Sequence, residues 1–182
     1  SWIDNEELAN ANVGFNLQFG WLDIDIDAED AYFNECIVAA LDHLGVDSRF
    51  RVGRRSVGFP THVLVQLAEE EAANFESLTK FEPREFRIDE KRFHTQLRSY
   101  PTGLTDKKNL ERSAKQTVMP GSIYMSKKDV GKPDPSVWYH KDKIAENVRQ
   151  IAATTPRRAS FNQIVRAIAF GTLLYAVSDH WV

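Results

Sequence analysis

The most informative part of the chain is Gly20-Trp21-Leu22-Asp23-Ile24-Asp25-Ile26-Asp27, in which acidic and aliphatic residues alternate. Successive side chains of a β-strand point to opposite faces, so the aliphatic residues can enter a core while the carboxylates share the other face. These carboxylates belong to Asp23, Asp25 and Asp27. At intervals of ~6.5–7 Å they repel one another unless a cation lies between them, and Mg²⁺ prefers such oxygen ligands. The pattern predicts a strand with a divalent metal site, although a solvated strand face would show the same alternation.

Strand and helix patterns follow one another along the rest of the chain. Apolar residues recur at helical spacing over residues 30–44, with Gly45 as the stop signal, and over 161–179, with Ser160 as the N-cap. Two further helices are expected over residues 68–78 and 142–153, and a charged loop over 101–112. Extended segments are predicted over residues 13–19, 49–55, 62–67, 86–98, 116–123 and 136–139. This order predicts an α+β or α/β domain.

Length and composition favour one compact domain. The chain has 182 residues, of which 42% are hydrophobic and 27% charged. No apolar run approaches the ~20 residues that cross a bilayer, and the acidic N-terminus lacks a secretion signal. A single cysteine, Cys36, excludes an internal disulfide and a cysteine-rich zinc site. These features predict a cytoplasmic protein with no membrane partner.

The net charge of −3 conceals a strong asymmetry. Residues 1–48 contain eleven acids and no lysine or arginine, whereas residues 49–182 contain 23 bases and the other 15 of the 26 acids. An acidic block followed by a basic body indicates that cations and anions bind in different places.

The basic body begins with Arg49-Phe50-Arg51-Val52-Gly53-Arg54-Arg55-Ser56, followed shortly by Thr61 and His62. Four arginines within seven residues, with nearby hydroxyl and imidazole groups, offer many donors for phosphate oxygens. The competing interpretation is a solvated edge strand, on which arginines discourage aggregation. A lone histidine such as His62 is more often structural than a ligand.

Two later segments of the chain also have a recognisable pattern of residues. In the stretch Arg92-Phe93-His94-Thr95-Gln96-Leu97-Arg98-Ser99, the apolar positions share one face and His94, Gln96 and Arg98 share the other. The stretch Lys115-Gln116-Thr117-Val118-Met119-Pro120-Gly121-Ser122 leads into a Pro-Gly turn. Neither segment is diagnostic alone.

Taken in order, the four segments resemble the catalytic core of the archaeo-eukaryotic primase superfamily, and most closely the primase-polymerase domains of phages and plasmids. Leu22-Asp23-Ile24-Asp25 resembles the Asp-x-Asp metal motif of that family. The stretch from Val52 to His62 resembles its second motif, in which a Ser/Thr-His pair contacts the triphosphate of the incoming nucleotide. Gln116-Thr117-Val118-Met119-Pro120-Gly121-Ser122 resembles a further stretch of the phage and plasmid members.

The resemblance implies template-directed nucleotidyl transfer, for primer synthesis or DNA polymerisation, by a two-metal mechanism with Mg²⁺ or Mn²⁺ and no zinc. Asp23 and Asp25 would bind the metals, with Asp27 as a further candidate. The implied nucleotide-binding residues are Arg54, Ser56, Thr61, His62, Arg98, Lys115 and Ser122. Single-stranded DNA would contact the basic remainder of the chain, including Lys107, Lys108, Arg112, Lys127 and Lys128.

The resemblance also implies an architecture. We expect a two-lobed α+β core, with a palm like the RNA-recognition-motif fold and a smaller N-terminal subdomain. Residues 1–182 would form one catalytic domain of a longer replication protein, and the helices over 142–182 would lead toward a further domain, expected to be a helicase.

One position departs from the family in a way that matters for activity. Gln96 stands where the family has its third catalytic carboxylate, and glutamine is the poorer metal ligand. Either the protein is a weakened enzyme, or a Glu→Gln substitution has inactivated it, or the motif has a different register. A nucleotide-binding or single-stranded-DNA-binding module without efficient synthesis is therefore an alternative. A metal-dependent nuclease is a less favoured one, because no general base is evident.

Overall fold

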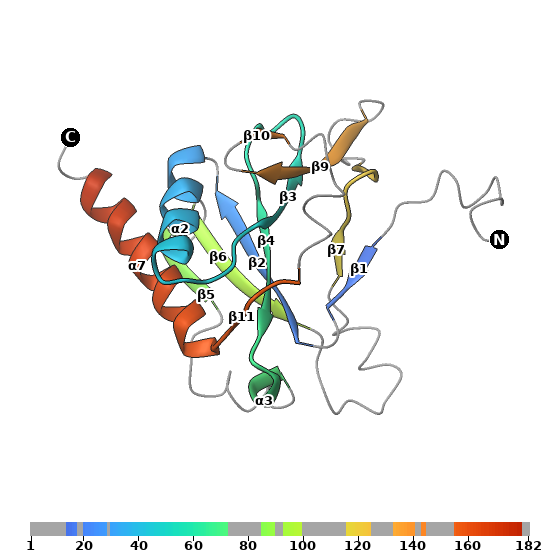
Figure 1. The fold of residues 1–182 in the computed structure, drawn as a ribbon. Helices are drawn as coiled ribbons and strands as arrows, with labels where there is room; N and C mark the ends of the chain where they lie inside the picture. Colours follow the sequence, from blue (N-terminus) through green and yellow to red (C-terminus); the bar gives the residue numbers. More distant parts are fainter. Residues whose placement is uncertain are drawn as a thin grey trace.

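The computed structural model describes residues 14–17, 20–28, 30–72, 85–89, 93–99, 116–124, 133–140, 143–144 and 155–179. Within these residues the chain is a mixed α+β structure built on an antiparallel sheet (Figure 1). Its helices are α2 (Ala31–His43), α3 (Glu69–Ala72) and α7 (Phe161–Asp179). Its strands are β1 (Gly14–Asn16), β2 (Trp21–Ala28), β3 (Phe50–Arg54), β4 (His62–Leu67), β5 (Glu85–Asp89), β6 (Phe93–Ser99), β7 (Gln116–Val118), β8 (Ile123–Tyr124), β9 (Asp134–His140), β10 (Lys143–Ile144) and β11 (Arg158–Ala159).

The large sheet has the strand order β10-β9-β3-β4-β2-β6-β5, so the acidic strand β2 lies between β4 and β6. All pairings along this path are antiparallel. The short strand β11 pairs with β4 in parallel, and β8 pairs with β9. A central position gives β2 two neighbouring strands that can place side chains beside its carboxylates.

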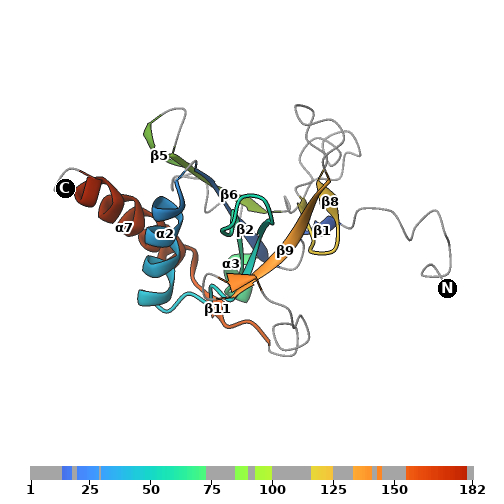
Figure 2. The same ribbon diagram turned by 90° about the horizontal axis from the view of Figure 1, so that it is seen from above.

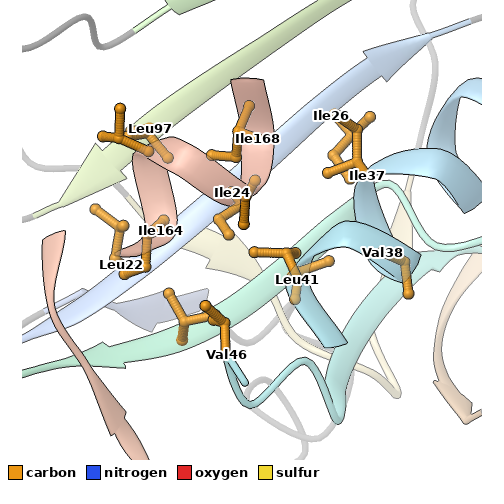
Figure 3. Packing of buried hydrophobic residues seen from close by; sticks show 14 of the residues in the cluster. Leu22, Ile24, Ile26, Ile37, Val38, Leu41, Val46, Leu97, Ile164 and Ile168 are labelled. Carbon is orange, nitrogen blue, oxygen red and sulfur yellow. The ribbon is translucent and has the colours of Figure 1, made fainter. Parts of the chain in front are cut away.

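One face of β2 is the centre of the hydrophobic core. Its aliphatic residues Leu22, Ile24 and Ile26 are fully buried, as the alternation predicts. Helices α2 and α7 lie side by side against this face of the sheet (Figures 1 and 2). Figure 3 shows the aliphatic side chains of β2 and Leu97 of β6 packed among side chains of both helices. Each such burial stabilises the fold by ~1.5–3 kcal/mol, which fixes the carboxylates on the opposite face.

The two long helices begin where the sequence predicts. Asp30 caps α2 by accepting a hydrogen bond from the Tyr32 backbone N–H at 2.9 Å. Ser160 caps α7 by accepting one from the Gln163 N–H at 3.2 Å. Gly45, with φ of 75°, follows the end of α2, a conformation that glycine adopts without strain.

The second sheet consists of β1 and β7, which pair from Gly14↔Val118 to Asn16↔Gln116. It lies on the side of the main sheet away from α2 and α7 (Figures 1 and 2). A smaller apolar cluster accompanies it on this side, formed by Leu17, Phe50, Val52, Leu64 and Trp138. The carboxylate face of β2 is thereby partly covered rather than open to solvent.

Most predicted elements are confirmed where the structure describes them, and three need correction. The single extended segment expected over residues 86–98 is two strands, β5 and β6, which pair with each other in antiparallel fashion. The helix expected over residues 142–153 is wrong at its start, because Lys143 and Ile144 form strand β10 against Tyr139 and His140. The strand expected over 116–123 is two short strands, β7 and β8, because a turn at Pro120 and Gly121 (φ 94°) divides it. The loop expected over 101–112 lies outside the described residues.

The α+β class is confirmed, whereas the single-domain boundary and the two-lobed arrangement remain predictions. None of the helices in the described ranges is both long enough and apolar enough to cross a membrane.

Candidate functional site

The register of three strands gathers the polar residues that the sequence separates. Asp25 of β2 lies opposite His62 of β4 on one side and Gln96 of β6 on the other. Asp23 lies opposite Arg98 of β6. Because directly opposed residues share a face, these side chains converge on the face of β2 away from the helices.

The converging side chains form a close network of ion pairs. His62 Nδ1 lies 3.1 Å from Asp23 Oδ2 and 3.4 Å from Asp25 Oδ1. The Arg98 guanidinium approaches Asp25 Oδ2 at 3.1 Å and Asp23 Oδ2 at 3.7 Å. Thr117 of β7 donates a hydrogen bond of 2.5 Å to Asp23 Oδ2. Cationic side chains thus offset the repulsion between the two carboxylates.

Burial and neighbouring charges shift the pKa values of two residues in this network, Asp25 and His62. Burial raises the pKa of Asp25 above its ordinary value, although His62 and Arg98 oppose this rise. Burial alone would lower the pKa of His62, but its hydrogen bond to Asp23 and the charges of Asp23 and Asp25 outweigh it and raise that pKa. The network therefore favours a protonated His62.

A pocket of about 430 Å³ opens beside this network. Its volume is in the range of pockets that hold small ligands, ~300–1,000 Å³. The polar wall brings two carboxylates together with several donors, contributed by Asp25, Asp27, Arg54, Thr61, His62, Arg98, Thr117 and Ser136. The apolar wall includes Val52, Val57 and Val118. Such a pocket suits a ligand with both anionic and apolar parts.

The four arginines after residue 48 separate into different roles. Arg49 pairs with Asp47 at 2.6 Å, and Arg51 is buried and pairs with Asp42 at 3.1 Å. Both arginines stabilise the connection between α2 and β3. Arg54 lines the pocket, whereas Arg55 is exposed. Of the cluster predicted to bind phosphate, Arg54 is the member that the fold brings to the pocket.

Gly53 explains how the pocket wall is built. A Cβ atom at this position would lie 2.7 Å from the Phe59 carbonyl oxygen and 3.1 Å from the Thr61 nitrogen. Thr61 N–H also donates a hydrogen bond of 3.0 Å to the Val52 carbonyl. The close approach folds residues 57–61 back onto β3 and carries Thr61 and His62 to the pocket.

Several predicted site residues lie elsewhere. Ser56 is exposed and donates hydrogen bonds from its backbone N–H and its hydroxyl to Asp134, so it does not line the pocket. Ser122 is buried in the turn between β7 and β8, where its N–H donates to the Met119 carbonyl at 3.1 Å. Gln96 is partly buried beside Asp25 and is not part of the pocket wall. The remaining predicted residues lie outside the described part of the chain, namely Lys107, Lys108, Arg112, Lys115, Lys127 and Lys128.

Sequence reasoning did not single out Thr117 or Ser136. Thr117 lies on a short strand, and the alternation of side chains along a strand could have indicated the face to which Thr117 points. It could not have indicated the partner, Asp23, because that residue is 94 residues away in the sequence. Ser136 is buried on β9 and donates to the Val118 carbonyl at 3.1 Å, which joins β9 to β7 beside the pocket.

The carboxylates that could hold a cation at the pocket are Asp25 and Asp27. Across the described ranges, no cluster of three or more His, Cys, Asp or Glu side chains has the arrangement of a metal site. A pair is nevertheless a suitable donor set for Mg²⁺, which commonly binds one or two carboxylates and completes its shell with water and phosphate oxygens. The carboxylates present therefore have the donor chemistry that a hard divalent cation requires, as a pair and not as a larger cluster.

Comparison with known proteins found no matching family model, no matching curated protein and no matching solved structure. The functional hypothesis therefore depends on the motifs and on the geometry of the pocket.

Proposed function

We propose that this chain binds a nucleoside triphosphate with a divalent cation in the pocket beside β2 and catalyses template-directed nucleotidyl transfer. The observation that carries the proposal is the convergence on one pocket of residues from three separate sequence motifs. Asp25, His62 and Arg98 come from β2, β4 and β6, and the first two match the motifs of primase-polymerases.

The charges of the pocket match the parts of such a ligand. Arg54, His62 and Arg98 can neutralise and orient phosphate oxygens, and the hydroxyl groups of Thr61 and Ser136 can donate further hydrogen bonds. The apolar wall offers contact area for a sugar or base without hydrogen-bond readout. A pocket that binds the phosphates through charged donors and contacts the base through apolar groups would accept different bases in turn, as a templated reaction requires.

Asp25 and Asp27 would hold Mg²⁺ or Mn²⁺ together with the phosphates. When bound, the cation supplies charge stabilisation to the phosphate that is attacked and to the oxygen that leaves. The chain itself contributes binding and orientation, since Arg98 and His62 already lie within 3.1–3.4 Å of Asp25.

A second candidate function is favoured by one residue. Gln96 faces Asp25 across β2 and β6, at the position where a primase-polymerase carries another carboxylate. A neutral amide there leaves the site with the binding carboxylates and removes one that would help to activate a primer hydroxyl. The chain would then bind nucleotide, or single-stranded DNA, without efficient synthesis.

The finer architecture and the partners belong to the same proposal. The main sheet with α2 and α7 would be the palm, and β1 with β7 would belong to the smaller subdomain. Single-stranded DNA is the expected template, and a helicase domain in the same polypeptide is the expected neighbour in a cytoplasmic replication protein.

Primer extension on a single-stranded DNA template tests the proposal. The reactions contain Mg²⁺ or Mn²⁺, nucleoside triphosphates, and wild-type, Gln96→Glu or Asp25→Asn protein. We expect Gln96→Glu to extend the primer roughly tenfold or more faster than wild type, and Asp25→Asn or chelation of the metal to abolish extension.

The exposed Glu35→Gln variant is the control, and it should match wild type. Nucleotide binding without extension by wild type and Gln96→Glu would support the second candidate. No binding and no extension by either protein would contradict both functions, and cleavage of the labelled template would instead indicate a nuclease.

A further inference from the structure

Asp23 differs from the other carboxylates of β2 in its surroundings. It is fully buried, whereas the Asp25 side chain is 21% exposed and Asp27 is exposed. The pocket wall includes Asp25 and Asp27 but not Asp23. A cation that shares its coordination shell with a ligand in the pocket would therefore meet Asp25 and Asp27 first.

The Asp23 carboxylate is already engaged on several sides. Thr117 donates to Oδ2, and His62 Nδ1 lies 3.2 Å from Oδ1 and 3.1 Å from Oδ2. Arg98 lies 3.7 Å from Oδ2. His62 and Arg98 also lie 3.4 Å and 3.1 Å from Asp25, so the Thr117 hydrogen bond is what distinguishes Asp23. Binding a metal through Asp23 would require the Thr117 hydroxyl to move, and this hydroxyl is held on a buried strand residue.

We infer that Asp23 is a positioning residue, which holds His62 with a proton on Nδ1 and turns its Nε2 toward the triphosphate, while Asp25 and Asp27 hold the cation. The inference rests on the proposed function and assigns separate tasks to the three carboxylates. It departs from the family resemblance, in which Asp23 and Asp25 together bind metal.

The chemistry of the ring nitrogens supports this assignment. Nδ1 faces carboxylate oxygens of Asp23 and Asp25, which accept hydrogen bonds and donate none when ionised. A proton on Nδ1 satisfies this contact and fixes the orientation of the ring, as a carboxylate does for many functional histidines. His62 lines the pocket, and because Nδ1 faces the carboxylates, Nε2 is the ring nitrogen that we expect to meet a ligand there.

Two binding measurements separate the assigned roles. Mn²⁺ alone is titrated into the protein and followed by electron paramagnetic resonance, and a nucleoside triphosphate is then titrated at saturating Mn²⁺. We expect Asp25→Asn and Asp27→Asn to weaken Mn²⁺ binding roughly tenfold or more, and Asp23→Asn to leave it within about twofold.

The triphosphate titration should give a different ranking. Asp23→Asn and His62→Ala should each weaken triphosphate binding roughly tenfold, and the double variant should be no weaker than His62→Ala alone, because both changes remove one interaction. The variant Glu35→Gln is the control for charge removal at an exposed site.

The result that would overturn the positioning role of Asp23 differs from the result that would overturn the proposed function. If Asp23→Asn loses Mn²⁺ as completely as Asp25→Asn, the positioning role is overturned. If wild-type protein binds Mn²⁺ but no triphosphate, the proposed function is overturned, and the Mn²⁺ ranking still decides whether Asp23 is a ligand.

A spectroscopic measurement on wild-type protein does not depend on the folding of any variant. Long-range ¹⁵N–¹H correlation spectra of the imidazole rings report which nitrogen carries the proton. We expect a proton on Nδ1 of His62 in the metal-free protein, and an unprotonated Nδ1 would overturn the positioning role.

Discussion

The hydroxyl of Thr117 donates a hydrogen bond to Asp23 Oδ2 across 94 residues of sequence, joining β7 to the centre of the main sheet. Both residues are buried, at 2% and 0% exposure. The bond therefore couples the small β1–β7 sheet to the carboxylate network, and the sheet edge that it anchors forms one wall of the pocket.

Removal of this hydroxyl should destabilise the protein. Thr117→Val keeps the shape of the side chain but leaves a buried carboxylate without one donor, so we expect the free energy of unfolding to fall by ~1–3 kcal/mol. Thr117→Ser keeps the donor and should lose less. Denaturant unfolding of the three proteins checks this, and equal stability of the Val and Ser variants would contradict a structural role for the bond.

Gly171 is predicted to be required where α7 crosses α2. A Cβ at this position would lie 2.8 Å from the Cys36 carbonyl oxygen and 2.8 Å from the Ile37 Cα. Helix propensity alone predicts that Gly171→Ala stabilises α7 by ~1 kcal/mol, whereas the close contact predicts a loss of ~1–3 kcal/mol. The exposed Ala169→Gly variant is the control and should lose ~1 kcal/mol. A higher melting temperature for Gly171→Ala would refute the close packing of the helices.

Asp47 should make stability depend on pH. Its side chain is 2% exposed and accepts hydrogen bonds from Arg49 Nε at 2.7 Å and the Arg157 N–H at 2.9 Å. Burial opposes ionisation, but these bonds outweigh it and lower the pKa of Asp47 below its ordinary value. The resulting stabilisation is present above the unfolded-state pKa, near ~3.9, and is lost as pH falls through the lower folded-state pKa.

We therefore expect Asp47→Asn to be ~1–3 kcal/mol less stable than wild type at neutral pH, with a difference that shrinks as pH falls from about 5 toward about 3. Denaturant unfolding across this range measures the difference, with the exposed Glu69→Gln variant as control. A difference that stays constant with pH would show that ionised Asp47 is not the source of the stabilisation.

The arginines of the basic segment should differ in their effect on ligand binding. Arg54 lines the pocket and Arg55 is exposed outside it. Loss of a charged donor to phosphate costs roughly a factor of ten in affinity, so Arg54→Gln should bind a nucleoside triphosphate about tenfold more weakly than wild type. Arg55→Gln should remain within about twofold. Calorimetric titration checks this, and equal losses would indicate a diffuse electrostatic effect instead of a specific contact.

Local patterns were sufficient to predict most of the described elements. The alternation of Leu22, Ile24 and Ile26 with carboxylates predicted both faces of β2, because strand periodicity depends on adjacent residues. Helical spacing predicted α2, and the cap at Ser160 predicted the start of α7, for the same reason. Strand β10 was missed because a two-residue strand has no periodicity of its own and depends on its partner β9.

The site could be predicted only in part. Asp25 and His62 were identified by motif, and the register of β2 with β4 places them together. The burial of Asp23, its bond to Thr117 and the structural pairing of Arg49 with Asp47 depend on long-range packing or on the direction of a long side chain. Spacing along the sequence does not contain that information.

The most direct test of the central claim is a calorimetric titration of wild-type and Asp25→Asn protein with a nucleoside triphosphate in the presence of Mn²⁺. We predict saturable binding of one triphosphate by wild-type protein, lost on chelation of the metal and weakened roughly tenfold or more in Asp25→Asn. Absence of binding to wild-type protein, or equal binding by the two proteins, would contradict the assignment of this pocket to a metal-bound nucleotide.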